Sequence, residues 1–251
     1  MRVLVGDKLD SKAAIREIGT VDVSGLGEKE RLLAFALLAV SESATIRFLA
    51  DADFDRLLQR VPPPNVWLTD LRDLEHYLLD DRCLEKVWGV ALGRDGVSCT
   101  DIRATILANA RIVGVLRLMS EAENLCLPFQ ETDLGRRIVI EAESVTVDLQ
   151  KLIIALLQNA SRSLSGLSAI ETRHREWTER HIETPDDDLA HGKDCLVLVR
   201  EMTKGYGVGR KEASRLMWTS FDVRFVDRYP VLRQVVDYLT GAGGDPTVGE
   251  T

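Results

Sequence analysis

The sequence predicts an α/β fold in which a mostly parallel sheet flanked by helices is followed by a mainly helical second half. Short apolar runs typical of strands alternate with helical stretches over the first 95 residues, which favours parallel strands joined by right-handed crossovers. Long helical patterns dominate the rest of the chain. The hydrophobic content is 45% over 251 residues, which is enough to bury a full core. We therefore expect an α/β core at residues 1–95 and a mainly helical region at residues 96–251 that returns to the site near residues 190–204.

The elements of the first part follow from apolar spacing and turn residues. Leucines and alanines predict a helix at residues 28–40, and the apolar run that ends at Ala50 predicts a buried strand. Three consecutive prolines at 62–64 then enforce an extended connection to the next strand. The expected elements are a strand at 3–5, a helix at 11–18, a Gly-rich turn at 24–27, a helix at 28–40, strands at 45–50 and 65–69, and a helix through Leu78 capped by Thr69 or Asp70.

The second half is predicted to be helical with one strand. A Gly-rich segment, Gly205 to Lys211, invites a phosphate-loop interpretation, but it lacks the Gly-Lys-Ser/Thr ending and follows a helix. A loop between two helices is therefore favoured, and nearby Lys204 and Arg215 could still touch a nucleic-acid backbone. The expected elements are helices at 101–123, 147–161, 166–181 and 191–204, a strand at 136–141, a break at 185–188 and a frayed tail after Gly241.

The composition excludes some classes of function. A formal net charge of −8 argues against a broad basic surface that binds nucleic acid by charge alone. It leaves room for an enzyme that grips phosphates through metal ions, because carboxylates must hold those ions. The longest apolar run, Leu32 to Val40, is far shorter than the roughly 20 residues that span a bilayer. The four cysteines form no CxxC pair, so we expect a cytoplasmic chain with reduced cysteines and no membrane partner.

Acidic residues follow both strands that precede residue 75. Along an extended chain, residues two apart point the same way, so Asp51 and Asp53 would present their carboxylates on one side of the chain. Ligands of open α/β sheets collect at the carboxyl ends of the strands, where Asp70, Asp73 and Glu75 also fall. Magnesium takes oxygen ligands and needs only one or two protein carboxylates. The pattern predicts an acidic site for a divalent metal ion.

Each acidic residue also has a local explanation. Aspartates end strands and start turns for reasons of backbone geometry, so an isolated Asp-x-Asp is more often a turn than a ligand pair. Asp70 and Asp73 could be the cap and first-turn acids of the following helix, and this is the favoured interpretation for Asp73. Glu75 lies beyond the first-turn capping positions and beside the apolar face. A specific partner is therefore favoured for Glu75 over solvent.

Three stretches carry a family resemblance: Phe48 to Asp55, Pro63 to Asp70, and Asp73 to Glu75. They resemble the Toprim domains of the OLD-like nucleases, and more closely an uncharacterised bacterial Toprim-type family that includes effector nucleases of phage-defence systems. In that family a hydrophobic strand ends in Asp-x-Asp, and the next strand leads into a Thr-Asp-x-x-Asp-Leu-Glu helix. The match is specific over Ile46 to Leu79, about a third of the chain with its looser flanks.

The resemblance implies a site and an activity. It implies that Asp51 and Asp53 bind Mg²⁺ or Mn²⁺ with Asp55 close by, and that Glu75 holds a second ion. Because the strand at 65–69 should run parallel in the same sheet, Glu75 is also predicted to face Asp53. Lys193, in a late Gly-Lys element, would meet the scissile phosphate at a helix start. The implied catalytic residues are then Asp51, Asp53, Glu75 and Lys193. The implied function is a metal-dependent nuclease of bacterial anti-phage defence, with nucleic acid as substrate and a homo-oligomer or a defence-system protein as partner.

The chain departs from the family pattern at its start. Toprim domains begin with a strand followed by a catalytic Glu-Gly, whereas Val5 stands before Gly6 here. Either the first strand lies upstream of Met1, or the glutamate is lost and Asp7 or Asp10 replaces it. The loss leaves a second hypothesis, a non-catalytic Toprim-like subunit that binds nucleic acid or a partner protein. A third, a magnesium phosphatase, is disfavoured because Phe54 and Asp55 follow where that class has a Gly-Thr-type turn.

Overall fold

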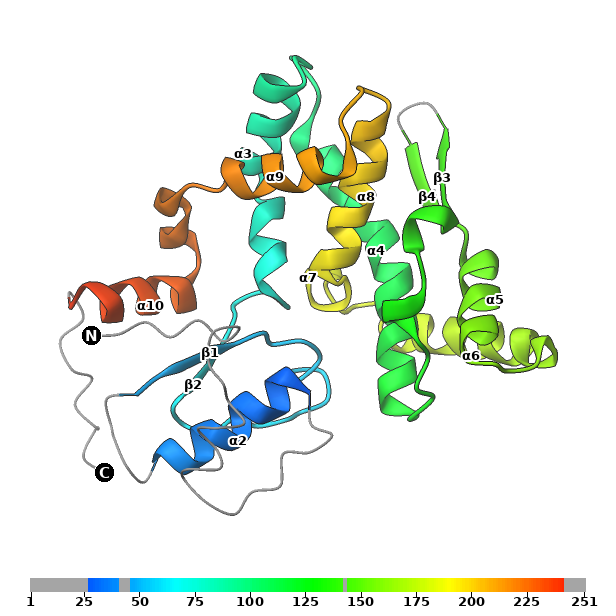
Figure 1. The fold of residues 1–251 in the computed structure, drawn as a ribbon, viewed down its shortest axis with the longest axis horizontal. Helices are drawn as coiled ribbons and strands as arrows, with labels where there is room; N and C mark the ends of the chain where they lie inside the picture. The colour runs from blue at the N-terminus through cyan, green and yellow to red at the C-terminus, as the bar shows by residue number, and fades with distance from the viewer. Residues whose placement is uncertain (1–26, 41–45, 142–143, 242–251) are drawn as a thin grey trace. The chain divides into compact units, whose positions relative to one another are not determined.

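The computed structural model describes residues 27–40, 46–141 and 144–241. Its described part is a mixed α/β fold, mainly helical, with small sheets of two strands each (Figure 1). This confirms the predicted α/β class and the helical second half, whereas a larger parallel sheet of Toprim type stays a prediction. The expected strand at 3–5, the helix at 11–18 and the tail after Gly241 lie outside the described residues, as do Asp7 and Asp10.

The chain divides into two compact units. Within the described residues, unit 1 comprises 27–40, 46–55, 59–70 and 223–241, and unit 2 comprises 56–58, 71–141 and 144–222. The predicted α/β core at residues 1–95 and helical region at residues 96–251 stay predictions, and the helices after Asp70 belong to the second unit. The last described segment joins the first unit, which the sequence did not predict.

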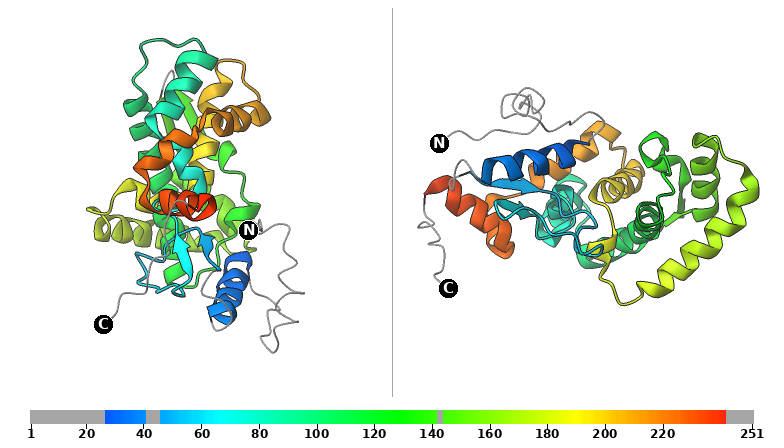
Figure 2. Two further views of the ribbon diagram at one scale, coloured as in Figure 1. Left: turned by 90° about the vertical axis from the view of Figure 1, so that its left-hand side faces the viewer. Right: turned by 90° about the horizontal axis from the view of Figure 1, so that it is seen from below.

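Unit 1 is built on a parallel strand pair. Helix α2 (Glu28–Val40) and strands β1 (Phe48–Ala50) and β2 (Val66–Leu68) confirm three predicted elements. The strands pair in parallel, with Phe48 opposite Val66 and Ala50 opposite Leu68. Helix α2 lies against β1, as Figures 1 and 2 show, with Ala36, Ala50 and Val66 buried at the centre of the apolar cluster. The carboxyl ends of both strands thus reach the same edge, as predicted for this pair.

The last described segment of unit 1 explains the role of Asp70. It contains a 3₁₀ turn, η7 (Val223–Arg228), and helix α10 (Pro230–Thr240). The Asp70 carboxylate accepts hydrogen bonds from the backbone N–H groups of Val231 (2.8 Å) and Leu232 (3.3 Å). These are first-turn N–H groups that have no partner inside their own helix. Asp70 therefore binds the start of α10, about 160 residues later in the sequence.

Unit 2 begins with a different helix from the predicted one. A 3₁₀ helix, η2 (Leu74–Leu79), is followed by α3 (Asp81–Glu85) and by the π-helical turn η3 (Lys86–Ala91). Asp73 caps η2, with its side chain accepting from the backbone N–H of His76 at 3.1 Å. The predicted cap at Thr69 or Asp70 is wrong, because the chain becomes helical only after residue 73. The cap interpretation of Asp73 is confirmed.

The rest of unit 2 surrounds a long central helix. Helix α4 (Cys99–Ala122) contacts α3, β4, α6, α7 and α8. Gly114 allows the closest approach, since a Cβ there would lie 1.8 Å from the carbonyl oxygen of Leu189. Val147 belongs to an unpredicted strand, which corrects the predicted helix start. The remaining elements are η4 (Phe129–Glu131), η5 (Leu134–Arg137), β3 (Ile138–Glu141) antiparallel to β4 (Ser144–Val147), α5 (Leu149–Asn159), η6 (Leu164–Gly166), α6 (Leu167–Arg180), α7 (Asp186–Leu189), α8 (Gly192–Lys204) and α9 (Arg210–Ser220).

Three further expectations concern the Gly-rich segment, membrane-spanning helices and the cysteines. Gly205 to Gly209 connects α8 to α9, so the interhelical interpretation of the Gly-rich segment is confirmed. Among the residues described, no helix is both long enough and apolar enough to cross a membrane. All four cysteines are free, and Cys83 and Cys195 are buried.

Candidate functional site

The loop after β1 is fixed to the end of β2. The backbone N–H of Thr69 donates to the carbonyl of Ala50 (3.0 Å), and the Thr69 hydroxyl accepts from the backbone N–H of Ala52 (2.9 Å). Asp53 then adopts a left-handed backbone with φ of 47°. Aspartate tolerates this region better than most residues. The chain therefore turns at Asp53, and strand alternation no longer decides where its carboxylate points.

The Asp53 and Asp55 carboxylates converge on one cation. The Lys29 ammonium from α2 lies 2.9 Å from the Asp53 carboxylate and 2.8 Å from that of Asp55. Asp55 also faces Arg60 at 3.5 Å, and its side chain is only 8% exposed. Burial alone would lower the pKa of Lys29, but its hydrogen bonds to Asp55 and Asp53 outweigh this effect and raise it. We call Lys29, Asp53 and Asp55 the Lys29 cluster.

Asp51 stands at the start of the same loop. It follows the last residue of β1 and is half-buried. The sequence predicted that Asp51 and Asp53 would share a cation, whereas the described contacts pair Asp53 with Asp55. A metal-binding role for Asp51 stays a prediction.

Asp73 is the polar centre of a junction in unit 2. One carboxylate oxygen lies 3.1 Å from both the backbone nitrogen and the ring Nδ1 of His76, and the other accepts from the backbone N–H of Gly192 at 2.8 Å. Burial raises the pKa of Asp73, but these bonds and the nearby His76 and His191 outweigh it and bring the pKa to about 2. Asp73 is therefore an ionised structural carboxylate.

The same junction brings two predicted site regions together. A Cβ on Gly192 would lie 2.7 Å from the Glu75 Cβ, so the start of α8 packs directly on the first turn of η2. Lys193 is exposed in the first turn of α8. Glu75 and the Lys193 segment are thus neighbours within unit 2. Because Asp53 belongs to unit 1, the predicted facing of Glu75 and Asp53 stays a prediction.

A metal fit can be tested on the Lys29 cluster. Two carboxylates within 3 Å of one ammonium already define a place for a single cation. Magnesium often uses only one or two protein carboxylates and fills its remaining positions with water and substrate oxygens. Within the described part of the chain, no group of three or more His, Cys, Asp or Glu side chains is arranged to hold a metal ion. Two carboxylates are enough protein ligands for a largely hydrated Mg²⁺ but not for an ion enclosed by protein, and metal binding at this cluster stays a prediction.

Lys29 itself was missed by the sequence interpretation, although a signal existed. It lies in the first turn of α2, where the helix dipole disfavours a cation. A lysine placed there between Glu28 and Glu30 suggests a specific anionic partner. The two carboxylates that bind it come from a loop more than 20 residues away, which only the fold reveals.

Comparison with known proteins found no matching family model, no matching curated protein and no matching solved structure.

Proposed function

We propose that this chain is a metal-dependent nuclease of Toprim type that cleaves phosphodiester bonds of nucleic acid, with a role in bacterial anti-phage defence. The observation that supports it best is the convergence of Asp53 and Asp55 on one cation at the carboxyl edge of the parallel strand pair. The Toprim resemblance of the same loop adds the expectation that the cation is divalent.

The ammonium of Lys29 is the natural competitor of that ion. A divalent ion concentrates twice the charge, and carboxylates are its preferred ligands. The Lys29 ammonium offsets only one of the two carboxylate charges, and its replacement breaks the ion pairs with Asp53 and Asp55 and frees the ammonium. Lys29 then becomes available to bind a phosphate oxygen of the substrate.

The residues divide the chemistry between them. Asp53, Asp55 and Asp51 would hold Mg²⁺ or Mn²⁺, which supplies polarisation of the phosphodiester and activation of a water molecule. Thr69 orients the loop through its bond to the Ala52 N–H. Glu75 and Lys193 enter the proposal through the family resemblance, as ligand of a second ion and as phosphate-binding cation.

A second candidate function has its own support. Since Lys29 and Arg60 already pair with Asp53 and Asp55, these carboxylates have cationic partners without any metal. This arrangement also suits a non-catalytic Toprim-like subunit that binds nucleic acid or a partner protein. Measuring metal binding and cleavage separately distinguishes the two candidates.

The test is calorimetric titration of Mg²⁺ and Mn²⁺ combined with cleavage of plasmid DNA, single-stranded DNA and RNA. The wild type should bind metal and cut at least one substrate, and Asp53→Ala should abolish both. Glu75→Gln should also stop cutting. Lys193→Ala should weaken cutting less, because one phosphate contact is lost while the carboxylates remain.

A matched control is Asp227→Ala. Asp227 is an exposed carboxylate of the same unit, with a side chain 68% accessible and paired with Arg233. Its loss should leave metal binding and cutting unchanged. Cutting that survives Asp53→Ala would contradict the proposed site, and metal binding without cutting of any substrate would favour the non-catalytic candidate.

A further inference from the structure

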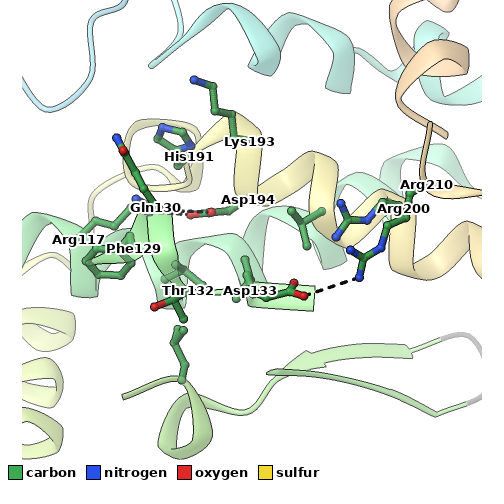
Figure 3. A pocket seen from close by; sticks show the side chains of 14 residues that line it. Arg117, Phe129, Gln130, Thr132, Asp133, His191, Lys193, Asp194, Arg200 and Arg210 are labelled. Carbon is green, nitrogen blue, oxygen red and sulfur yellow. Dashed lines mark hydrogen bonds and ion pairs between the residues drawn. The ribbon is translucent and has the colours of Figure 1, made fainter. Parts of the chain in front are cut away.

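Unit 2 contains a cavity of about 430 Å³ whose lining combines apolar and charged side chains. Its walls come from α4, η4, η5, α5, α8 and α9, so it lies entirely within unit 2. The volume falls in the lower part of the range for small-molecule sites, about 300–1,000 Å³. Figure 3 shows Phe129 and His191 toward one end of the cavity and Arg200 and Arg210 toward the other. The two ends differ in chemistry.

The lining carries an excess of positive charge. Its charged residues are Arg117, Lys193, Arg200 and Arg210 against Asp133 and Asp194, in a chain whose net charge is −8. The Arg117 guanidinium is already committed, since it donates to both carboxylate oxygens of Asp194 at 2.8 and 2.9 Å. Removing that neutral pair leaves three cations and one acid around the cavity.

The arginine end is incompletely neutralised. Arg200 approaches one oxygen of Glu201 at 3.4 Å, and Arg210 approaches the same oxygen at 3.9 Å. Glu201 is buried and also binds Lys204, so this single carboxylate is shared by Arg200, Lys204 and Arg210. The other acid near Arg210 is Asp133, at 3.9 Å, which is too long for a hydrogen bond. Each guanidinium has five N–H donors, and within the described part of the chain most of those on Arg200 and Arg210 are available to a further anion.

Phosphate is the anion that fits this end best. Guanidinium groups bind phosphate oxygens in a bidentate manner, and the bonds are charge-assisted. Two like charges that share a carboxylate oxygen repel each other, and a dianion between them removes the repulsion. A doubly charged phosphate monoester would therefore balance the excess charge of the cavity.

The opposite end suits a flat polar ring. Phe129 lines it, with the Arg117 guanidinium 4.4 Å above its ring, so the aromatic side chain is held in place. The Nδ1 atom of His191 is buried and has no hydrogen-bond partner among the residues that the structure describes. A buried ring nitrogen without a hydrogen-bond partner destabilises the fold unless a ligand or a water molecule supplies the hydrogen bond. A heterocycle with N–H groups can stack near Phe129 and complete this nitrogen.

We propose that the cavity of unit 2 binds a small phosphate monoester bearing a heterocycle, of the nucleoside monophosphate class, with its phosphate held by Arg200 and Arg210. The ring lies at the Phe129 and His191 end. The inference uses residues of unit 2 and does not rest on the proposed nuclease activity.

Calorimetric titration of the full chain tests the inference. The probes are adenosine, guanosine, cytidine and uridine 5′-monophosphates, the four nucleosides, inorganic phosphate and a single-stranded oligonucleotide. At least one monophosphate should bind, and at least tenfold more tightly than its nucleoside and than inorganic phosphate. Arg200→Gln/Arg210→Gln should weaken that binding at least tenfold, whereas Phe129→Leu should reduce the preference over inorganic phosphate.

The matched control is Arg175→Gln, the same chemical change at an exposed arginine of α6 outside the cavity. It should leave the affinity unchanged, and circular dichroism should show all variants folded. Absence of binding to every monophosphate, or equal affinity in the double variant, would overturn the proposal. Equal affinity for inorganic phosphate would overturn the heterocycle end, and tighter binding of the oligonucleotide through the same arginines would overturn the small-ligand assignment.

Discussion

The carboxylates of the Lys29 cluster in unit 1 and the carboxylate of Asp73 in unit 2 are neutralised by different kinds of group. Asp53 and Asp55 share the ammonium of a long side chain, and Asp53 is 37% exposed. Asp73 is buried and held by two backbone N–H groups and an imidazole. A side-chain ammonium can move away when another cation arrives, whereas backbone donors are fixed by the fold. The first arrangement suits exchange of ligands, and the second suits stability.

Gly192→Ala should cause the largest loss of stability, at the junction around Asp73 in unit 2. The new Cβ would lie 2.1 Å from an Asp73 oxygen and 2.9 Å from the His76 nitrogen, so α8 and η2 must separate. Overpacking of this kind costs up to about 3 kcal/mol. Hydrogen–deuterium exchange of the α8 and η2 peptides should show a matching loss of protection. Gly166→Ala is the control, since nothing lies within 4 Å of its added Cβ, and a normal exchange pattern in Gly192→Ala would refute the junction.

Asp73→Asn and Asp53→Asn test the two carboxylates by the same substitution. At Asp73 the new NH₂ group must face either the Gly192 N–H or His76, and in either position a donor replaces the acceptor and a hydrogen bond is lost. Leaving a buried polar group unsatisfied lowers the free energy of unfolding by about 2 kcal/mol. At Asp53 the side chain is partly exposed and Lys29 keeps Asp55, so the free energy of unfolding should change by less than about 0.5 kcal/mol. Urea titration followed by circular dichroism measures both. Equal losses would mean that the two sites do not differ in kind.

Acid should weaken unit 2 in two steps. Burial lowers the pKa of His191 to about 4, so the unfolded chain binds a proton more readily there. The stability from the neutral ring is then complete above pH 6.5 and is lost as pH falls toward 4. Asp73, with a pKa of about 2 against an ordinary 3.8, contributes about 2 kcal/mol that is lost between pH 4 and 2.

Exchange protection of the α8 peptides, measured from pH 7 downward, follows these two steps. His191→Asn should flatten the upper step and leave the lower one. Asp73→Asn should remove the lower step. A single transition that neither substitution alters would contradict the assignment of both groups.

The sequence predicted those parts of the fold that depend on local pattern. Helix α4 was expected at 101–123 and is observed at Cys99–Ala122, because its long apolar periodicity and its Ser98 cap lie in one segment. The partner of Asp70 could not be predicted in this way. It is the start of α10, about 160 residues later, and an aspartate carries no signal that distinguishes a near helix start from a distant one.

The candidate site shows the same limit. The acidic residues after β1 were found because they follow an apolar run, but their pairing depends on the turn at Asp53 and on the position of α2. Arg200 and Arg210 lie on opposite sides of the Gly-rich connection, and only the packing of α9 against α8 brings Arg210 to Glu201, the sequence neighbour of Arg200. Spacing along the chain cannot reveal a cation excess that tertiary contacts create.

Lys29→Met tests the smallest effect and the most specific one, the competition between ammonium and metal in unit 1. Methionine keeps the length and apolar contacts of the lysine stem and removes its charge, which leaves Asp53 and Asp55 facing each other without Lys29. Their mutual repulsion should then favour any cation that enters, so Mg²⁺ should bind several-fold more tightly than in the wild type by calorimetry. Cutting of nucleic acid should not rise in parallel if Lys29 also binds a substrate phosphate.

Lys151→Met is the control, because Lys151 is an exposed lysine of unit 2 that pairs with Asp148, and its loss should leave Mg²⁺ affinity unchanged. Unchanged or weaker Mg²⁺ binding in Lys29→Met would mean that Asp53 and Asp55 are a structural ion-pair cluster and not a metal site.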